Sequence, residues 1–310
     1  MVACTNVGRY IIEELVNNQK ITSELVGIVN LNQEQAIGKA NYDSYSDLIF
    51  KYKIPIFYCN NINDDETVEF IRNLTPDIII QSGWSQKFSD TVLNIPVYGC
   101  IGEHPAPLPR GRGAACVNWA ILTGETEWGD SYFRMVQEYD KGELFAQRNF
   151  KIETYDNVFT VYEKVAACAT EVIAEYADKW SNGIFDTIVQ DDSKATYYKR
   201  RRPIDGEIKD FSQNAETIHD FIRAQTFPYP GAYIQKGKEK IIIISSKYRK
   251  DIKIEFPVGT VISKTEEGGV LIACGDNSVL EILRIKCENS SSMWASDMFD
   301  EQSFPVKWFE

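Results

Sequence analysis

The stretch TPDIIIQSGW, Thr75–Trp84, indicates the fold most directly, because three consecutive isoleucines are followed by a glycine at its exit. A short, continuously apolar run of this kind is typical of a strand that is buried on both faces. Similar apolar runs precede it at Leu25–Leu31 and Ile54–Tyr58, and segments with helical spacing lie between them at Gly8–Asn17 and Asp64–Asn73. This alternation predicts a Rossmann-like α/β domain, with a mostly parallel sheet that helices cover on both faces.

Beyond residue 100 the alternation continues and then ends. We expect a helix over Ala114–Thr123, two paired strands over Asp130–Glu138 and Phe145–Ile152, and a long alanine-rich helix over Val158–Trp180. That helix lacks proline and closes the first domain, which we place at residues 1–182. Residues 183–210 are polar and irregular, and we expect them to connect the first domain to a second.

Residues 211–310 have a different pattern, in which a helix around Ala215–Ala224 precedes short β-rich runs that are separated by glycines. The expected strands are Lys240–Ser245, Lys253–Phe256, Thr260–Ser263, Val270–Cys274 and Val279–Lys286. This pattern predicts a smaller C-terminal domain that is rich in strands and barrel-like. The segment after Cys287 follows no clear pattern, and two interpretations stay open, a lid and a docking tail.

The distribution of charge bears on the partners of the chain. With 33 Lys+Arg against 45 Asp+Glu, the formal net charge is −12. Residues 191–310 hold 18 Lys+Arg against 19 Asp+Glu, which leaves 15 against 26 for residues 1–190. Binding to nucleic acid depends on clustered cations that neutralise phosphates, so this acidic balance argues against a nucleic-acid partner.

The cysteines and the hydropathy bear on the compartment. The 7 cysteines are odd in number and lack the paired close spacing of a zinc site, so we expect free thiols in a reducing cytoplasm and no bound metal. No apolar run approaches the length of about 18 residues that a membrane helix needs, and no signal-like segment begins the chain. These features predict a soluble cytoplasmic protein.

Motifs that are absent exclude several enzyme classes. Neither GxxxxGK[ST] nor GxGxxG occurs, which argues against a P-loop NTPase and a nicotinamide enzyme. GxSxG is absent as well, and with only 2 histidines, His104 and His219, the chain offers little for a zinc or serine-triad mechanism. His219 lies on the polar side of an amphipathic helix, where we expect it to have a structural role or none.

The other histidine, His104, opens the segment HPAPLPRGRG, residues 104–113. A strand that ends at His104 would present the ring at its carboxyl end, where open α/β sheets bind their ligands. Asp140 follows in EYDKGELFAQ, residues 138–147. We interpret the two residues as converging on one small-molecule site. The alternative is a buried, hydrogen-bonded histidine beside a turn stiffened by prolines.

The segment IGEHPAPLPRGRGAACVNWAILTGETEWGDSYFRMVQEYDKGELFAQ, Ile101–Gln147, resembles the folate-dependent formyltransferases. The similarity is to a strand, Asn-x-His-Pro-x-x-Leu-Pro, a Gly/Arg loop, a helix and a later Asp-x-Gly. It covers essentially the whole chain and is strongest toward bacterial nucleotide-sugar N-formyltransferases and the formylation domains of peptide synthetases, because YYKRRRPIDGEI and IRAQTFPYPGAY resemble segments of those proteins. The family also includes methionyl-tRNA formyltransferase.

The resemblance implies transfer of a formyl group from 10-formyltetrahydrofolate, a cosubstrate, to an amine. An attacking amine must lose a proton, and an imidazole with a pKa of about 6.5 suits that task, so His104 is expected to act as general base. Asp140 is expected to orient the ring and to stabilise its protonated form.

One residue departs from the pattern of the family. The motif has asparagine two residues before the histidine, where it helps to stabilise the developing oxyanion, and this chain has Gly102 there. Strand alternation sends Glu103 to the opposite face, so Glu103 cannot replace the asparagine. The donor is expected to come from Gln81, Ser82, Asn118 or a water molecule that the glycine admits, and the sequence does not decide between them.

The remaining site assignments follow from the same resemblance. Trp84 and Gln86 are expected to line the folate pocket, with ordinary core packing as the alternative for Trp84. Leu108 and Pro109 resemble the folate loop, and its opposite wall is expected at Glu138–Gly142, which includes Tyr139. Arg112, beside Gly113, is expected to hold a substrate phosphate, as are Lys199 and Arg201 of KRRRP, although such a basic run is often a solvated linker.

The expected function is that of a sugar N-formyltransferase. It would act on the primary amine of a UDP- or dTDP-linked amino-deoxy sugar, in the assembly of a surface glycan. Methionyl-tRNA formyltransferase is the first alternative, and the near-neutral segment of residues 191–310 argues against it. A non-catalytic module that binds folate or a nucleotide sugar is the second alternative, raised by Gly102. A homodimer is possible by the resemblance alone.

Overall fold

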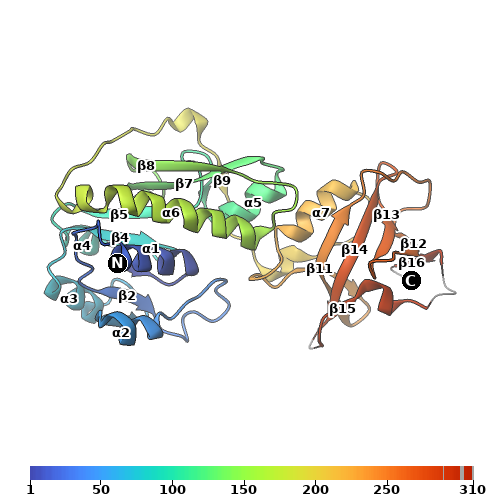
Figure 1. Ribbon diagram of the computed structural model, residues 1–310, viewed down its shortest axis with the longest axis horizontal. Helices are drawn as coiled ribbons and strands as arrows, with labels where there is room; N and C mark the ends of the chain where they lie inside the picture. Colours follow the sequence, from blue (N-terminus) through green and yellow to red (C-terminus); the bar gives the residue numbers. More distant parts are fainter. Residues whose placement is uncertain (289, 301–303, 309–310) are drawn as a thin grey trace. The chain divides into compact units, whose positions relative to one another are not determined.

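A computed structural model describes residues 1–288, 290–300 and 304–308 of the chain. The chain divides into two compact units, each shown in Figure 1. The first comprises Met1–Cys116, Glu127–Lys151 and Tyr162–Lys199, and the second comprises Val117–Thr126, Ile152–Val161 and Arg200–Glu310. This division assigns two segments within residues 1–182 to the second unit.

The first unit is built on a seven-stranded sheet in the order β3-β2-β1-β4-β5-β7-β8. Its strands are β1 (Val2–Ala3), β2 (Ile28–Leu31), β3 (Ile56–Cys59), β4 (Ile79–Ser82), β5 (Cys100–His104), β7 (Glu127–Arg134) and β8 (Leu144–Lys151). The pairs from β3 through β2, β1 and β4 to β5 are parallel, whereas the pairs β5–β7 and β7–β8 are antiparallel. The predicted α/β fold with a mostly parallel sheet is therefore confirmed.

Helices cover both faces of this sheet because successive strand residues point to opposite sides. Val2 belongs to a cluster with residues of α3 (Asp65–Asn73) and α4 (Asp90–Leu93). Its neighbour Ala3 belongs to a cluster with residues of α1 (Asn6–Asn17) and α2 (Ser46–Tyr52). The long helix α6 (Val158–Ser181) lies on the Ala3 face, where its Trp180 ring is 5.5 Å from that of Tyr132.

The register of the central strands determines which face of the sheet carries each residue of the expected site. Gln81 of β4 pairs with Gly102 of β5, and Gly102 in turn pairs with Phe133 of β7. These three residues form one row across the sheet, on the face that carries Val2. His104 lies two residues beyond Gly102 on the same face, at the carboxyl end of β5. Glu103 and its partner Tyr132 lie on the opposite face.

The loop after β5 forms a second, smaller sheet that the sequence did not reveal. Strand β6 (Arg112–Gly113) pairs in parallel with β9 (Tyr197–Tyr198), from the far end of the first unit. Gly113 has a φ of 100°, and a Cβ there would lie 2.4 Å from the carbonyl oxygen of Tyr198. Only glycine allows this approach of the two strands. Helix α5 (Cys116–Leu122) follows.

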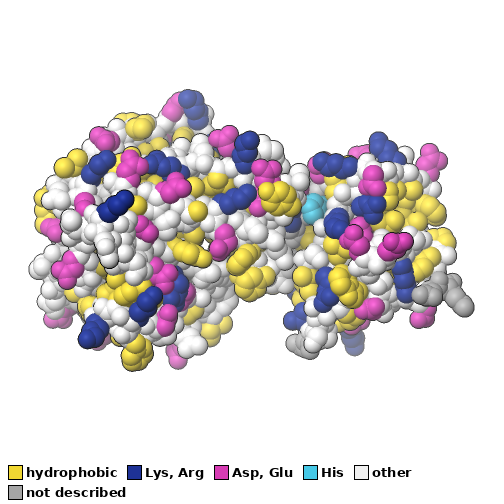
Figure 2. All heavy atoms as spheres, viewed as in Figure 1, with side chains coloured by type: hydrophobic (Ala, Val, Ile, Leu, Met, Phe, Trp, Pro, Cys, Tyr) yellow, Lys and Arg dark blue, Asp and Glu magenta, His cyan; other side chains and the backbone are white. Residues whose placement is uncertain are grey.

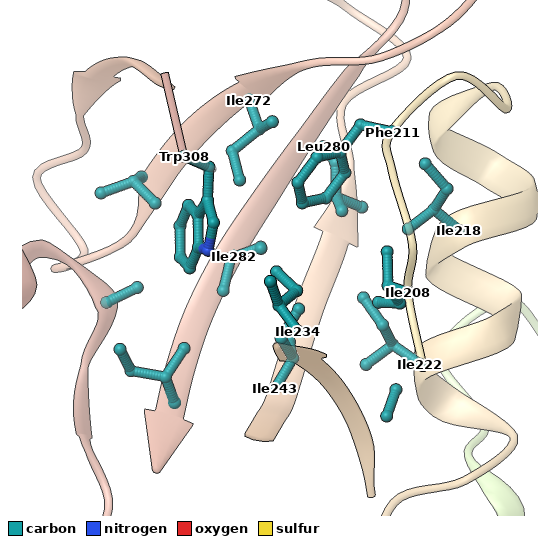
Figure 3. Packing of buried hydrophobic residues seen from close by; sticks show 14 of the residues in the cluster. Ile208, Phe211, Ile218, Ile222, Ile234, Ile243, Ile272, Leu280, Ile282 and Trp308 are labelled. Atoms are coloured by element: carbon teal, nitrogen blue, oxygen red, sulfur yellow. The ribbon is translucent and has the colours of Figure 1, made fainter. Parts of the chain in front are cut away.

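The second unit contains an antiparallel sheet in the order β10-β11-β14-β13-β12-β16. Its elements are α7 (Ala215–Arg223), β10 (Ala232–Lys236), β11 (Glu239–Tyr248), β12 (Thr260–Lys264), β13 (Val270–Ala273), β14 (Val279–Cys287), β15 (Met293–Trp294) and β16 (Val306–Lys307). Figure 3 shows Ile218 and Ile222 of α7 directed toward the isoleucines of this sheet. The expected strand-rich C-terminal domain is confirmed.

Two details of this unit differ from expectation. Residues Lys253–Phe256 form no strand, since Ile252 and Ile254 instead bond through their backbone to Arg249 and Asn277. The segment after Cys287 is part of the fold rather than a lid or a tail in its described residues: β15 pairs with β14, β16 pairs with β12, and Trp308 is buried in the core (Figure 3). Residues 289, 301–303, 309 and 310 lie outside the described residues.

Candidate active site

His104 lies at the carboxyl end of β5 and is 8% exposed. Its Nε2 is 2.8 Å from the carbonyl oxygen of Gly111. A carbonyl only accepts hydrogen bonds, so Nε2 carries a hydrogen and donates it. The other ring nitrogen, Nδ1, therefore holds either the lone pair of a neutral imidazole or the second proton of an imidazolium.

Asp140 faces that second nitrogen. Its Oδ1 is 3.9 Å from Nδ1 of His104, and its Oδ2 accepts a hydrogen bond of 2.8 Å from the backbone N–H of Gly113. Asp140 adopts a left-handed conformation with φ 57°, and its carbonyl oxygen accepts a hydrogen bond of 2.8 Å from Gln190. The structure thus brings together the histidine and the carboxylate that the sequence paired.

The surroundings change the protonation of His104. Burial by itself lowers the pKa of the ring, but the Cys116 sulfur and the Asp140 carboxylate raise it, and the net result is a pKa of about 10. The donation from the ring to Gly111 adds to the increase. In the free protein at neutral pH the ring is therefore an imidazolium, whereas the argument for a general base assumed an ordinary imidazole pKa.

Side chains that the sequence did not single out hold the loop after His104. The Ser131 hydroxyl donates to the carbonyl of Ala106 at 2.6 Å and accepts from the N–H of Leu108 at 3.1 Å. Gln147 donates to the carbonyl of Leu108 at 2.9 Å, and the indole of Trp128 donates to the carbonyl of Pro105 at 2.8 Å. Ser131 pairs with His104 in register, and this pairing across the sheet is invisible in the sequence.

Arg112 does not present its guanidinium to a ligand, contrary to the expected phosphate contact. Its side chain is 1% exposed, and Gln190 Oε1 accepts from Nε at 3.2 Å and from Nη2 at 2.7 Å. Nη1 donates to the Tyr197 hydroxyl at 2.8 Å, and Nη2 lies 2.8 Å from Asp192 Oδ1. Because its donors are engaged inside the first unit, Arg112 anchors the strand pair β6–β9.

The glycine that departs from the family pattern lies beneath an aromatic ring. A Cβ at Gly102 would be 2.7 Å from Cζ and 2.8 Å from Cε1 of Phe133. Phe133 is buried with Leu108 and Leu144 in a small apolar cluster. The glycine therefore makes room for an aromatic side chain, and the expectation that it admits a water molecule is wrong.

The three proposed replacement donors have different environments. The Ser82 hydroxyl donates to Glu103 Oε2 at 2.6 Å, on the face opposite His104. Asn118 donates to the carbonyl of Ala224 at 2.6 Å, within the second unit. Gln81 lies on the face of His104 beside Gly102, and its Nε2 has one contact, at 3.4 Å, with the carbonyl of Trp84.

A buried pair of acids, Glu103 and Asp130, lies on the opposite face of the sheet. Both are buried, and Oε1 of Glu103 and both carboxylate oxygens of Asp130 have no hydrogen-bond partner among the described residues. Burial raises the pKa of Glu103, and burial together with the charge of Glu103 raises the pKa of Asp130 well above its ordinary value. The raised pKa means that the Asp130 carboxyl favours its neutral, protonated form. Two acids from different strands meet here, a contact that the sequence could not show.

The residues expected around the folate have mixed environments. Trp84 packs against the core of the first unit, as its alternative interpretation proposed, and its indole nitrogen is buried without a hydrogen-bond partner among the described residues. Gln86 is engaged by the backbone of the loop after β3, where it accepts from Ile62 at 2.8 Å and donates to Asn60 at 2.7 Å. It thus fixes a loop in this structure.

The remaining expected folate residues lie on either side of Asp140 or in the loop after His104. Leu108 is buried at 2% exposure, and the carbonyl of Pro109 accepts from the N–H of Thr196. Glu138 and Tyr139 are exposed, Tyr139 at 61%. A Cβ at Gly142 would lie 1.7 Å from the carbonyl oxygen of Arg134, so this position requires glycine.

Lys199 and Arg201, two of the four basic residues of KRRRP, belong to different units. Lys199 is exposed and ends the first unit. Arg201 donates to Gln225 at 2.8 Å and to the carbonyl of Asp205 at 2.6 Å, and its guanidinium lies 5.2 Å from the ring centroid of Trp119. His219, the other histidine, contacts the Ser246 hydroxyl at 2.9 Å in the second unit, in agreement with a structural role.

Metal clusters and membrane-spanning helices are both absent from the described residues. Within residues 1–288, 290–300 and 304–308, no group of three or more His, Cys, Asp or Glu side chains could hold a metal ion. Over the same residues, no helix has the length and apolar character needed to cross a membrane.

Comparison with known families gives matches to both parts of the chain. The model of a family described as "Formyl transferase" matches residues 5–176. A second model, described as "Formyl transferase, C-terminal domain", matches residues 202–303. The first match alone covers more than half of the chain and includes His104 and Asp140.

Solved structures share the fold. HypX from Aquifex aeolicus, solved with tetrahydrofolic acid, has a TM-score of 0.63 and 19% identity over 88% of this chain, which spans 46% of HypX. WlaRD, a sugar 3N-formyl transferase solved with dTDP and 5-N-formyl-THF, has a TM-score of 0.66 and 15% identity over 94% of this chain and 97% of WlaRD. An N-formyltransferase from Helicobacter canadensis, solved with folinic acid and dTDP-3-aminofucose, has a TM-score of 0.64 and 15% identity over 91% and 97%.

Proposed function

The chain belongs to the formyl transferase family, and on that premise we propose that it transfers a formyl group from 10-formyltetrahydrofolate to the primary amine of a nucleotide-linked amino-deoxy sugar. The observation that supports this most strongly is the pairing of His104 with Asp140 at the carboxyl end of β5, 3.9 Å apart. A proton-transfer group and its counter-charge stand there at the edge of the sheet where this class of fold binds ligands.

The choice of a sugar nucleotide as acceptor has separate support. Two of the similar structures contain a dTDP moiety together with a folate, and this chain spans 97% of each. Their identity of 15% supports a shared fold, so the step from fold to substrate is part of the proposal. We propose UDP or dTDP as the nucleotide, and a cytoplasmic reaction in the assembly of a surface glycan.

The chemistry requires one proton to move from the amine to the folate. The amine nitrogen forms a bond to the formyl carbon, the bond from that carbon to N10 of the folate breaks, and N10 takes up a proton. His104 is raised to a pKa of about 10 and is an imidazolium at neutral pH, so it starts as an acid. We propose that it protonates the leaving N10 and then accepts the proton of the attached amine. The base role expected from sequence becomes the second half of this relay.

Asp140 supports both halves of the relay. Its carboxylate stabilises the imidazolium, and the N–H of Gly113 fixes its Oδ2 so that Oδ1 faces Nδ1. When His104 has given up its proton, the same carboxylate favours its return. Asp140 is thus a positioning residue, and its effect on the reaction is carried by the ring of His104.

The proposed binding residues follow from what the structure leaves accessible. We assign the exposed Glu138 and Tyr139 to the folate, and the buried Leu108 together with Pro109 to the loop beside it, with Gly142 as the turn and Trp84 and Gln86 as support for that pocket. Since the guanidinium groups of Arg112 and Arg201 are both engaged by protein groups, a phosphate contact is proposed for Lys199. Gly113 contributes its N–H to Asp140 rather than to the substrate.

The alternative of a tRNA substrate has less support. Figure 2 shows Lys and Arg side chains dispersed among Asp and Glu on the visible face, rather than gathered in one basic area. A tRNA-binding surface needs clustered cations. Filter binding tests this alternative, because tight tRNA binding that weakens steeply with salt would favour it.

Stabilisation by ligands is the direct test of the proposed substrates. A ligand that binds the native state raises the melting temperature by mass action. We expect dTDP- or UDP-amino sugars to raise it further when 5-formyltetrahydrofolate is present. A chain that releases tetrahydrofolate in the presence of an amino-sugar nucleotide is an enzyme, whereas stabilisation by both ligands without any release would favour the non-catalytic binding module.

A further inference from the structure

The proposed reaction places a negative charge on one oxygen atom, and that atom needs a hydrogen-bond donor. When the amine attacks the formyl carbon, the electron pair of the C=O π bond moves to oxygen. Donors aimed at that oxygen are among the largest contributions to acyl transfer. The inference below rests on the proposed function and identifies which residue of this chain supplies the donor.

The donor must share a face of the sheet with His104. Gly102, the residue two positions before His104 on that face, has no side chain, and Phe133 fills the space above it. On the other side of Gly102 in the same row lies Gln81 of β4. Neighbouring strands are about 4.8 Å apart, so the Gln81 side chain starts one strand spacing from Gly102, on the face that carries His104.

Other nearby donors are committed elsewhere. The single hydroxyl hydrogen of Ser131 is donated to Ala106, and that of Ser82 is donated to Glu103 on the opposite face. The thiol of Cys116 is 3.3 Å from the carbonyl of Pro105. The indole nitrogen of Trp84 is fully enclosed, so a ligand cannot reach it.

The amide of Gln81 is different in this respect. Its side chain is nine-tenths buried, at 8% exposure of the residue, so it is held in place by its surroundings. An amide carries two N–H hydrogens. The contact of Nε2 with the carbonyl of Trp84 is 3.4 Å long, near the limit for a hydrogen bond, and it uses one of them. One N–H is left for a ligand oxygen.

We propose that Gln81 is a catalytic residue whose amide donates a hydrogen bond to the formyl oxygen as it becomes negative. Gln81 stabilises the tetrahedral adduct, and the oxygen lone pair then re-forms the C=O bond as the bond to N10 breaks. His104 delivers the proton to N10. The hydrogen-bond donor therefore comes from β4, beside Gly102, whereas the family motif places it at residue 102 on β5.

The test compares Gln81→Met with the wild type in two reactions of the full chain. Methionine keeps the length of glutamine and removes the donor. One readout is formyl transfer to the amino-sugar nucleotide, and the other is the slow hydrolysis of 10-formyltetrahydrofolate, in which water replaces the amine. We expect kcat to fall about 10²- to 10³-fold in both, with little change in KM. Ser82→Ala, on the same strand but the other face, is the matched control and should stay within about 3-fold.

A rescue separates loss of the donor from a general disturbance of the strand. Gly102→Asn with Phe133→Ala places an amide in the same row, because the ring that blocks a Cβ at residue 102 is then gone. Added to Gln81→Met, this pair should recover at least about 10-fold of the lost kcat. Recovery supports the assignment, and a folded triple variant no faster than Gln81→Met contradicts it.

The outcomes distinguish the two proposals. If the wild type turns over and Gln81→Met is equally fast, the assignment of Gln81 is wrong and the proposed function stands. If the wild type neither transfers nor hydrolyses the formyl group, the proposed function fails, and the assignment of Gln81 fails with it.

Discussion

Phe133 occupies the space that a side chain at residue 102 would need, because its ring atoms Cζ and Cε1 would lie 2.7 and 2.8 Å from a Cβ at Gly102. The two residues are direct partners across β5 and β7. The glycine therefore matches a packing demand from the neighbouring strand. The aromatic ring of Phe133 thus lies where a polar side chain at residue 102 would have to pass.

Because Phe133 packs on Gly102, substitutions at these two positions should have non-additive effects on the free energy of unfolding. Gly102→Asn alone forces the two side chains into the same volume and should lower the free energy of unfolding by about 1–3 kcal/mol. In the Phe133→Ala background the same change should be tolerated, so the coupling between the two sites should exceed about 1 kcal/mol. Urea denaturation of the four chains measures it. Additive effects would show that Phe133 does not constrain residue 102.

The raised pKa of His104 predicts how turnover depends on pH. The imidazolium is lost as the pH rises through about 10, so kcat/KM should have an alkaline limb there if the ring starts as an acid. Cys116 and Asp140 both raise the pKa of His104, so removing the carboxylate in Asp140→Asn should move the limb to lower pH. Asparagine also tolerates the left-handed backbone at this position. A limb at the same pH in both proteins would contradict the ion pair.

The buried acids predict a pH-dependent stability. The pKa of Asp130 is raised in the folded state, so the native protein keeps a proton that the unfolded chain releases, and stability falls as the pH rises above the ordinary carboxyl range. Asp130→Asn cannot titrate, and asparagine has nearly the same size as aspartate. The melting temperature of the wild type should therefore fall relative to that of the variant as the pH rises above the ordinary carboxyl range. Parallel curves would rule out a proton held by Asp130.

The contacts of Arg112 predict that its substitution lowers the stability of the protein, whereas the sequence suggested that it would weaken substrate binding. Its engagement by Gln190, Asp192 and Tyr197 means that Arg112→Met should destabilise the first unit by about 3–5 kcal/mol, because buried partners lose their donor. KM for the nucleotide should change little in the fraction that stays folded. Lys199→Met is the comparison, since it should raise KM and leave the melting temperature unchanged. The reverse pattern would return Arg112 to the substrate.

Local patterns of sequence predict the elements of this fold well, and contacts between strands much less well. The isoleucines before Gly83 correctly indicate β4, and the alanine-rich stretch indicates α6. His104 and Asp140 come from adjacent motifs and could be paired by position. The contact of Phe133 with Gly102, the bond of Ser131 to the loop, and the Glu103–Asp130 pair all depend on the register of β5 against β7, which no local pattern reveals.

The expectations for Lys253–Phe256 and for Arg112 differ from the structure for a common reason. Lys253–Phe256 alternates like a strand, but its backbone bonds to a turn. Arg112 stands in a glycine loop typical of ligand binding, but the loop pairs with β9, whose residues are more than 80 positions away and bring Tyr197 to the guanidinium. In both places a partner distant in sequence decides the outcome.

Formyl transfer itself is the measurement closest to the central claim. Wild-type protein is incubated with 10-formyltetrahydrofolate and a panel of dTDP- and UDP-linked amino-deoxy sugars, and tetrahydrofolate release and the mass of the sugar nucleotide are followed together. We expect one tetrahydrofolate for each N-formylated sugar, and in His104→Ala a loss of several orders of magnitude with folate binding retained. No formylated sugar from the wild type, or unchanged turnover in His104→Ala, would contradict the account.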